Sequence, residues 1–214
     1  MQIFNASAVL NVGRLTYNPS LCLPHLTVTS FDKLIIPFKI PGHEHATIRG
    51  VVLDKDNCFA KDKDDKVWPA YSDIWTKLQE TYPKEHLLIV SNSAGTNDDG
   101  NYEQAEKLER DTGVTVLRHP TKKPGCHEEI MAYFAKHGIH KPSEIVVIGD
   151  RLFTDMLMAN MMGAWGIWLS EGVELSNKIW CKMERGLYDR LVKSRDLPLS
   201  PPTPGVDQSE ESKL

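Results

Sequence analysis

Two carboxylates one residue apart, Asp54 and Asp56, are the side chains of this sequence best suited to chemistry. They directly follow the apolar run 51–53, which is typical of a strand buried on both faces. Acids this close repel each other unless a cation lies between them or one keeps its proton. One ionised carboxylate could therefore act as a nucleophile or as a ligand for a hard metal ion, and the other could transfer a proton. A simple helix cap after the strand is the structural alternative.

Polar side chains follow the other apolar runs of the chain in the same way. In parallel sheets, ligands bind beyond the carboxyl ends of the strands, so these side chains would meet the two acids at one edge. We expect the following residues there: Ser91 and Asn92 after the run 87–90, Lys122 and Lys123 shortly after the run 114–117, and Asp150 after the run 145–148.

The elements that would position these residues alternate between strand and helix. This alternation favours a parallel sheet with helices on both faces and right-handed crossovers. We therefore predict the α/β class with a doubly wound parallel sheet. Strands are predicted at 48–53, 87–90, 114–117, 145–148 and 166–169, and helices at 69–81, 102–113, 124–138, 153–162 and 176–193, the third with proline in its first turn.

The segments that flank this core differ from it. Residues 1–45 are predicted to form an N-terminal arm, residues 46–195 the core, and residues 196–214 a disordered tail rich in Pro, Ser and Glu. The proline-interrupted stretch 34–41 should be an extended segment that covers an apolar edge or touches a membrane. A helix in the arm would either pack on its own domain or on a second copy of the chain, or lie at a membrane interface; its apolar face would contain Phe4, Ala8, Val12 and Leu15.

Composition narrows the function classes. A chain of 214 residues with 41% hydrophobic content can bury the core of one domain. The net charge of −4 excludes a globally basic nucleic-acid-binding protein. Four cysteines without CxxC spacing indicate a reduced interior instead of a disulfide framework or a zinc site. No apolar stretch approaches the roughly 18 residues needed to span a bilayer, so we expect a soluble or peripheral protein.

Acids, a hydroxyl and a lysine at one edge are suited to phosphoryl transfer. A few carboxylates together with substrate oxygens and water bind Mg²⁺ well. The hydroxyl of Ser91 and nearby backbone N–H groups could hold the phosphoryl oxygens, and Lys123 could offset the charge of the transition state. The P-loop pattern GxxxxGK[ST] does not occur, which argues against a nucleotide triphosphatase of that class.

Four motifs of the chain resemble those of the haloacid dehalogenase superfamily of phosphatases. They occur in the family's order: Asp54-x-Asp56, Ser91, Lys123 before Pro124, and Gly149-Asp150-x4-Asp155. Over most of residues 1–195 the chain is similar to the mitochondrial phosphatidylglycerophosphatases of cardiolipin synthesis, with signatures at 17–22, 51–57, 118–127 and 149–155. The resemblance implies a Rossmann-like core and a phospholipid substrate, phosphatidylglycerophosphate. It also implies a peripheral location on the matrix side of the mitochondrial inner membrane.

The resemblance also implies roles for individual residues. Asp54 would attack phosphorus and form an aspartyl phosphate, and Asp56 would protonate the leaving alkoxide and then deprotonate the attacking water. Mg²⁺ would be held by Asp54, by the backbone carbonyl of Asp56 and by Asp150. Lys55, between the two acids, should point away from the metal.

The phosphoryl group would be bound by a second set of residues, Ser91, Asn92 and Lys123. Asp155 would support the metal shell or orient the lysine, and the alternative for it is an acid at the start of a helix.

The motif spacing excludes an inserted cap domain. Ser91 lies only 37 positions after Asp54, and Lys123 lies 32 positions after Ser91, lengths already used by each crossover. An open site would suit a bulky lipid head group. Arg118 and Lys122, with His119 and Lys123, would then form a basic rim for a second phosphate, unless only Lys123 of this loop is functional. A capless phosphatase for a soluble or macromolecular ester and a non-catalytic scaffold are the competing functions.

Overall fold

A computed structural model describes residues 13–175, 179–192 and 199–205 of the chain. The described residues form one six-stranded sheet in which every paired neighbour is parallel, in the order β1-β6-β5-β2-β3-β4. The strands are β1 (Leu26–Val28), β2 (Gly50–Leu53), β3 (Leu87–Ile89), β4 (Thr115–Val116), β5 (Ile145–Gly149) and β6 (Trp165–Leu169). The predicted α/β class and doubly wound parallel sheet are therefore confirmed, and no cap domain interrupts the described part of the chain.

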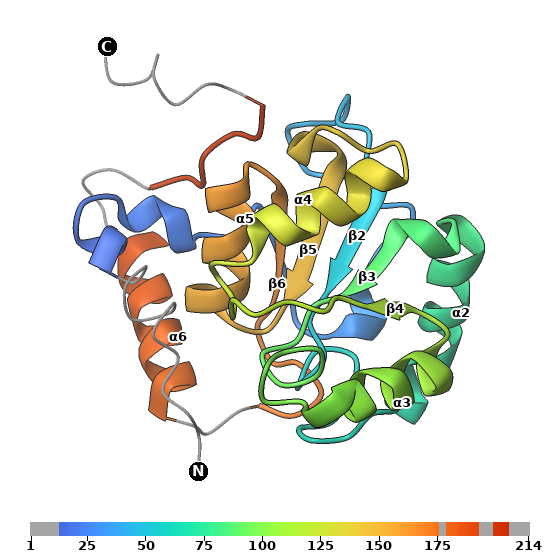
Figure 1. The fold of residues 1–214 in the computed structure, drawn as a ribbon. Coiled ribbons are helices and arrows are strands. Elements are labelled where there is room, and N and C mark those ends of the chain that lie inside the picture. Colours follow the sequence, from blue (N-terminus) through green and yellow to red (C-terminus); the bar gives the residue numbers. More distant parts are fainter. Residues whose placement is uncertain (1–12, 176–178, 193–198, 206–214) are drawn as a thin grey trace.

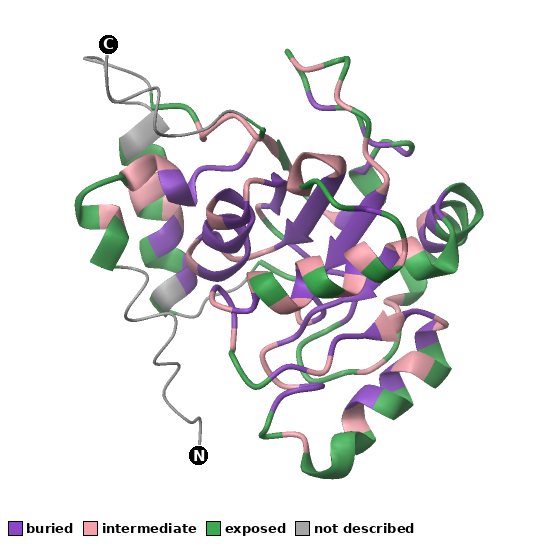
Figure 2. Cartoon of the chain, turned by 45° about the horizontal axis from the view of Figure 1, so that its top comes forward, coloured by how far each residue is buried: buried purple, intermediate pink, exposed green. Residues whose placement is uncertain are grey.

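Helices cover both faces of this sheet (Figure 1). Alternate strand residues point to opposite faces, so that Val52 packs towards α4 (His127–Lys136) and α5 (Leu157–Met162). Val51 and Leu53 pack on the other face, against α2 (Ser72–Thr81) and α3 (Glu103–Thr112). The last helix, α6 (Ile179–Val192), lies at the end of the molecule away from α2 and α3. Figure 2 shows that the central strands are buried throughout.

The chain changes direction across the sheet between β2 and β5. From β2 it proceeds through β3 to β4 on one side, and from β5 through β6 on the other. Such a switch point opens a crevice at the carboxyl ends of the two central strands. Asp54 follows β2 and Asp150 follows β5, and the register that pairs Leu53 with Ile148 brings these two ends level.

The segment assigned to an N-terminal arm contributes to the sheet and the core. Leu26–Val28 form a strand that pairs with β6, which the sequence analysis did not predict because the run is only three residues long. The stretch 34–41 forms no regular strand and packs on the core, with Leu34, Ile36, Phe38 and Ile40 buried. Leu15 lies in a short 3₁₀ turn, Gly13–Thr16, whereas Phe4, Ala8 and Val12 lie outside the described residues.

Two further boundaries differ from the predictions. The helix expected to begin at Pro124 begins at His127, and Pro124 belongs to the preceding loop with a cis peptide bond to Lys123. In the tail, residues 199–205 lack regular secondary structure but lie on the fold, where the His25 ring donates from Nε2 to the carbonyl of Pro202 at 2.9 Å. Residues 196–198 and 206–214 of the predicted disordered tail lie outside the described residues.

Candidate active site

Three buried or half-buried carboxylates converge where β2 and β5 end. One ligand oxygen each from Asp54, Asp150 and Asp155 lies within 4.8 Å of the other two. Asp54 is fixed by its position one residue after β2, where its backbone N–H donates to the carbonyl of Ile148 at 2.9 Å. The carboxylates therefore meet because adjacent parallel strands end side by side, as the sequence analysis expected for Asp54 and Asp150.

Lys123 adds one positive charge to this group of acids. Its Nζ donates to Oδ1 of Asp155 at 2.7 Å and also to Oδ1 of Asp54. Both the lysine side chain and Asp155 are almost fully buried, at 3% and 1% exposed. The loop after β4 is held for this contact, because the backbone N–H of Lys123 donates to Oδ1 of Asn92 at 2.8 Å.

Burial and like charge shift the ionisation of the acids. Removal from water raises the pKa of Asp54 to about 7; Lys123 opposes this rise and Asp155 adds to it. Burial, with the charges of Asp54 and Asp155, also raises the pKa of Asp150 well above its usual range. For Lys123, burial disfavours the ammonium form, but Asp155 and Asp54 outweigh it and raise its pKa. The lysine thus stays charged, whereas Asp54 and Asp150 release their protons less readily than exposed acids.

Asn57 holds Asp150 in this arrangement. Its Nδ2 donates to Oδ2 of Asp150 at 2.9 Å, while its Oδ1 accepts from the N–H of Glu174 at 3.0 Å. The backbone of Asn57 is left-handed, with φ of +59°, a conformation that Asn tolerates better than most residues. The amide thereby links a carboxylate after β5 to the loop after β6.

Asp155 reaches the site from the first turn after the strand because of two neighbours. Its Oδ2 accepts from the N–H of Arg151 at 3.1 Å. A Cβ at Gly149 would lie only 2.3 Å from that same oxygen, so glycine is required there for the carboxylate to fit. The Arg151 guanidinium points away from this acid and binds Glu184 of α6 at 2.9 and 3.0 Å.

Ser91 and Asn92 follow β3 as predicted, at the same edge of the sheet as Asp54 and Asp150. Ser91 is fully buried, and its Oγ lies 3.1 Å from Oγ of Ser93 and accepts from the Ser93 N–H at 3.2 Å. The observed contact of Asn92 is with the backbone of Lys123, so the amide positions the lysine loop.

Asp56 lies apart from the three carboxylates. Its Oδ1 accepts from Nζ of Lys55 at 2.7 Å and from the N–H of Lys63 at 2.8 Å. The sequence analysis expected the backbone carbonyl of Asp56 to bind the metal ion, and this ligand role stays a prediction. The sequence analysis expected Lys55 to point away from the metal but named no partner for it.

The predicted basic rim is largely neutralised by partners. Arg118 binds Glu109 through two contacts of 2.5 and 2.9 Å and also donates to the carbonyl of Val116. Lys122 pairs with Asp98 at 2.5 Å. His119 is buried, with both ring nitrogens facing carbonyl oxygens, and burial lowers its pKa. Through these two contacts His119 ties the lysine loop, at Thr121, to the segment after β3, at Ser91.

Sequence reasoning gave no role to Asn57 and no partner to Lys55, two residues that shape the site. Both are polar residues inside the first motif, next to the acids, and that proximity was the signal available. What the sequence did not show is that the chain turns back after Asp56, so that both side chains point into the fold.

A known family model matches the part of the chain that contains the site. Residues 6–174 match the family model described as mitochondrial PGP phosphatase, in which PGP is phosphatidylglycerophosphate. This chain belongs to the mitochondrial PGP phosphatase family. The resemblance to mitochondrial phosphatidylglycerophosphatases is thus confirmed.

Curated relatives of the family cover most of the chain. It is 52% identical to phosphatidylglycerophosphatase GEP4, mitochondrial, of Saccharomyces cerevisiae, over 87% of this chain and 98% of that protein. It is 33% identical to the probable phosphatidylglycerophosphatase, mitochondrial, of Schizosaccharomyces pombe, over 81% and 86%. The chloroplastic/mitochondrial phosphatidylglycerophosphate phosphatase 1 of Arabidopsis thaliana is 31% identical over 72% of this chain and 42% of its own length.

Proposed function

We propose that this chain removes the phosphomonoester of phosphatidylglycerophosphate to give phosphatidylglycerol, by the chemistry of haloacid dehalogenase phosphatases. The observation that carries the proposal is the convergence of Asp54, Asp150, Asp155 and Lys123 at the switch point, in a chain whose family and named relatives are phosphatases of this lipid. A scaffold would not require this expensive burial of like charges.

The carboxylates fit a magnesium ion. They offer hard oxygen ligands within 4.8 Å of one another, and Asp54 and Asp150 have raised pKa values because their negative charges are buried together. Asp54 and Asp150 would hold Mg²⁺ with the carbonyl of Asp56, and Asp155 would support them. When bound, the ion supplies positive charge that lets the anionic nucleophile and the phosphate approach each other.

The residues of the chain then divide the reaction into two steps. An oxygen of Asp54 bonds to phosphorus while the bond from phosphorus to the lipid oxygen breaks, and that oxygen takes its proton from Asp56. In the second step Asp56 removes a proton from water, the water oxygen bonds to phosphorus, and the bond to Asp54 breaks to release phosphate. Lys123 and Ser91 would hold the phosphoryl oxygens during both steps, with Asn92 positioning the lysine.

A site without a cap domain is suited to a substrate that stays in a bilayer. The described part of the chain includes no cap over the crevice and no helix long and apolar enough to cross a membrane. We propose a peripheral contact with the matrix side of the mitochondrial inner membrane, in line with the mitochondrial names of the relatives. For the second phosphate of the lipid we propose Lys122 as the binding residue. Its ion pair with Asp98 is partly exposed and can be replaced by a pair with the phosphate at a lower cost in free energy than the two-contact pair of Arg118 with Glu109.

A substrate comparison tests the function. Phosphate release is measured with Mg²⁺ on phosphatidylglycerophosphate in mixed micelles, and on glycerol phosphate and nucleotides in solution. The proposal expects kcat/KM for the lipid to exceed that for the soluble esters by about 100-fold or more, since binding energy from the remote head group is available only there. Equal kcat/KM values for the lipid and the soluble esters would contradict the lipid substrate and favour a capless phosphatase that acts on another ester.

A further inference from the structure

Lys55 is a fully buried lysine located between the two catalytic candidates. Its side chain has 0% exposure, a rare state for a lysine unless it is paired. Its Nζ donates to Oδ1 of Asp56 at 2.7 Å and to the backbone carbonyl of Asp64 at 2.9 Å. Oδ1 of Asp65 lies 3.9 Å away. The ammonium group is thus surrounded by acceptors from a single loop, 56–65.

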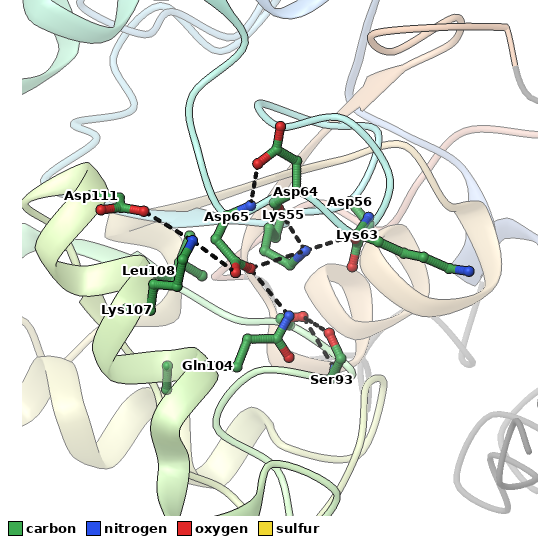
Figure 3. A network of polar contacts seen from close by, with 12 residues as sticks. Lys55, Asp56, Lys63, Asp64, Asp65, Ser93, Gln104, Lys107, Leu108 and Asp111 are labelled. Atoms are coloured by element: carbon green, nitrogen blue, oxygen red, sulfur yellow. Dashed lines mark hydrogen bonds and ion pairs between the residues drawn. The ribbon is translucent and has the colours of Figure 1, made fainter.

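A network fixes this loop to α3 (Figure 3). Asp65 accepts from Nε2 of Gln104 at 3.1 Å and from Nζ of Lys107 at 3.2 Å, both on α3. Lys107 is itself held by Asp111 one turn further on, at 3.1 Å. The loop carries the backbone N–H of Lys63, the second donor to Asp56. The two donors that contact Asp56 therefore both depend on the position of the loop.

The contacts with Asp56 are concentrated on one of its oxygens. Both Lys55 Nζ and the Lys63 N–H donate to Oδ1, which uses the acceptor capacity of that atom. A proton carried by Asp56 therefore belongs on Oδ2, because a protonated Oδ1 could not accept from two donors. The arrangement selects which oxygen can give a proton to the leaving group.

We propose that Lys55 is a positioning residue that holds Asp56 by Oδ1 and so presents Oδ2 to the leaving oxygen of the substrate. The inference rests on the proposed function, in which Asp56 protonates that oxygen. In this step the bond from phosphorus to the leaving oxygen breaks, its electron pair stays on the oxygen, and the Oδ2 proton of Asp56 moves to it. Lys55 itself contacts neither phosphorus nor the proton in flight.

The experiment uses the dependence of the rate on the leaving group. Lys55→Met, which keeps a long side chain but removes the charge, is compared with the wild-type full chain and with Lys66→Met. Lys66 is an exposed lysine of the same segment, so the control makes the same change without touching Asp56. The substrates, assayed with Mg²⁺, are dinitrophenyl, nitrophenyl and phenyl phosphate and micellar phosphatidylglycerophosphate. The quantity compared is kcat/KM, which reports the steps up to phosphoryl transfer to Asp54 and omits hydrolysis of the phosphoenzyme.

The proposal expects a selective loss. Lys55→Met should lower kcat/KM about 100-fold for the lipid and for phenyl phosphate, whose leaving oxygens need a proton, and by less than about threefold for dinitrophenyl phosphate, whose leaving group does not. Lys66→Met should match wild type on all four. An equal loss on every substrate, or an unchanged lipid rate, would overturn the proposal.

Further controls distinguish a failure of this inference from misfolding of the variant and from a failure of the proposed function. The ratio of the kcat/KM values for two substrates, measured on one protein sample, does not depend on the fraction of the protein that is folded. Lys55→Gln keeps a hydrogen-bond donor, so its kcat/KM should fall for the same substrates but by a smaller factor. Insoluble protein from both variants would assign Lys55 a purely structural role and overturn the inference. Turnover by Asp54→Asn, in contrast, would contradict the proposed function itself.

Discussion

Lys123 and Asp155 form a buried ion pair, with 2.7 Å between Nζ and Oδ1. The same ammonium group also donates to Asp54, so one lysine joins an acid that follows β2 to an acid that follows β5. The loop after β4 thereby contributes to the site at the switch point. The geometry explains why a lysine far from both acids in sequence belongs to the site.

Replacing Lys123 should affect both activity and stability. Lys123→Met removes the charge that compensates Asp54 and Asp155, so phosphate release should fall by at least about 100-fold. At pH 8, above the pKa of about 7 of Asp54, the free energy of unfolding should fall by about 3 kcal/mol because a buried pair is broken. Urea unfolding measures the second effect, with Lys136→Met on the exposed face of α4 as a matched control. An unchanged urea midpoint would show that the pair contributes no stability.

The amide of Asn57 should set the affinity for magnesium. Asn57→Gly keeps the left-handed backbone and removes the donor to Asp150, so the Mg²⁺ concentration that gives half-maximal activity should rise about tenfold. Calorimetric titration of Mg²⁺ checks the same change without turnover. Asn101→Gly is the matched control, since Asn101 is exposed and also left-handed, with φ of +55°. Equal Mg²⁺ affinities for the two variants would remove the role given to Asn57.

Gly149 should tolerate no side chain. In Gly149→Ala the new methyl group would lie 2.3 Å from Oδ2 of Asp155, so the carboxylate must move. A displacement of this size should reduce kcat/KM about 100-fold. Gly186→Ala on α6, where a Cβ meets no atom within 4 Å, should leave activity unchanged. Full activity of Gly149→Ala would mean that Asp155 is not needed where it lies.

The pH dependence of stability should reveal the raised pKa of Asp54. Its folded pKa, about 7, exceeds its usual value of 3.8, so the folded state binds this proton more tightly than the unfolded state. The resulting stabilisation is complete below about pH 4 and is lost as pH rises through 7. Without metal, the stability of wild type relative to Asp54→Asn should therefore decrease over this range. Urea unfolding in the presence of a chelator measures this relative stability at each pH. If it increased with pH instead, the pKa of Asp54 would be lowered by folding and not raised.

Five of the six strands and the position of the acids could be predicted largely from local pattern. Apolar runs such as 145–148 end at polar residues, and the parallel sheet brings those ends to one edge, which is how Asp54 and Asp150 were placed together. The strand Leu26–Val28 could not be found in this way, because three residues carry too little periodicity and their pairing with β6 is set by contacts distant in sequence.

Side-chain partners depended on the tertiary structure. The sequence placed Arg118 in a basic rim, but Glu109, nine residues earlier on α3, neutralises it. Lys55 was expected to point away from the metal, with no partner named, and only the turn of the loop 56–65 reveals that it binds Asp56. Spacing identifies which residues come together at a strand end, whereas ion pairing is decided by neighbours that spacing does not show.

Trapping the phosphoenzyme tests the central claim most directly. Phosphatidylglycerophosphate labelled in its monoester phosphate is mixed with enzyme and Mg²⁺, quenched with acid within one turnover, and the labelled peptide is located. The account predicts an acid-stable, base-labile label on Asp54 that is absent from Asp54→Asn. Label on another residue, or full turnover by Asp54→Asn, would contradict it.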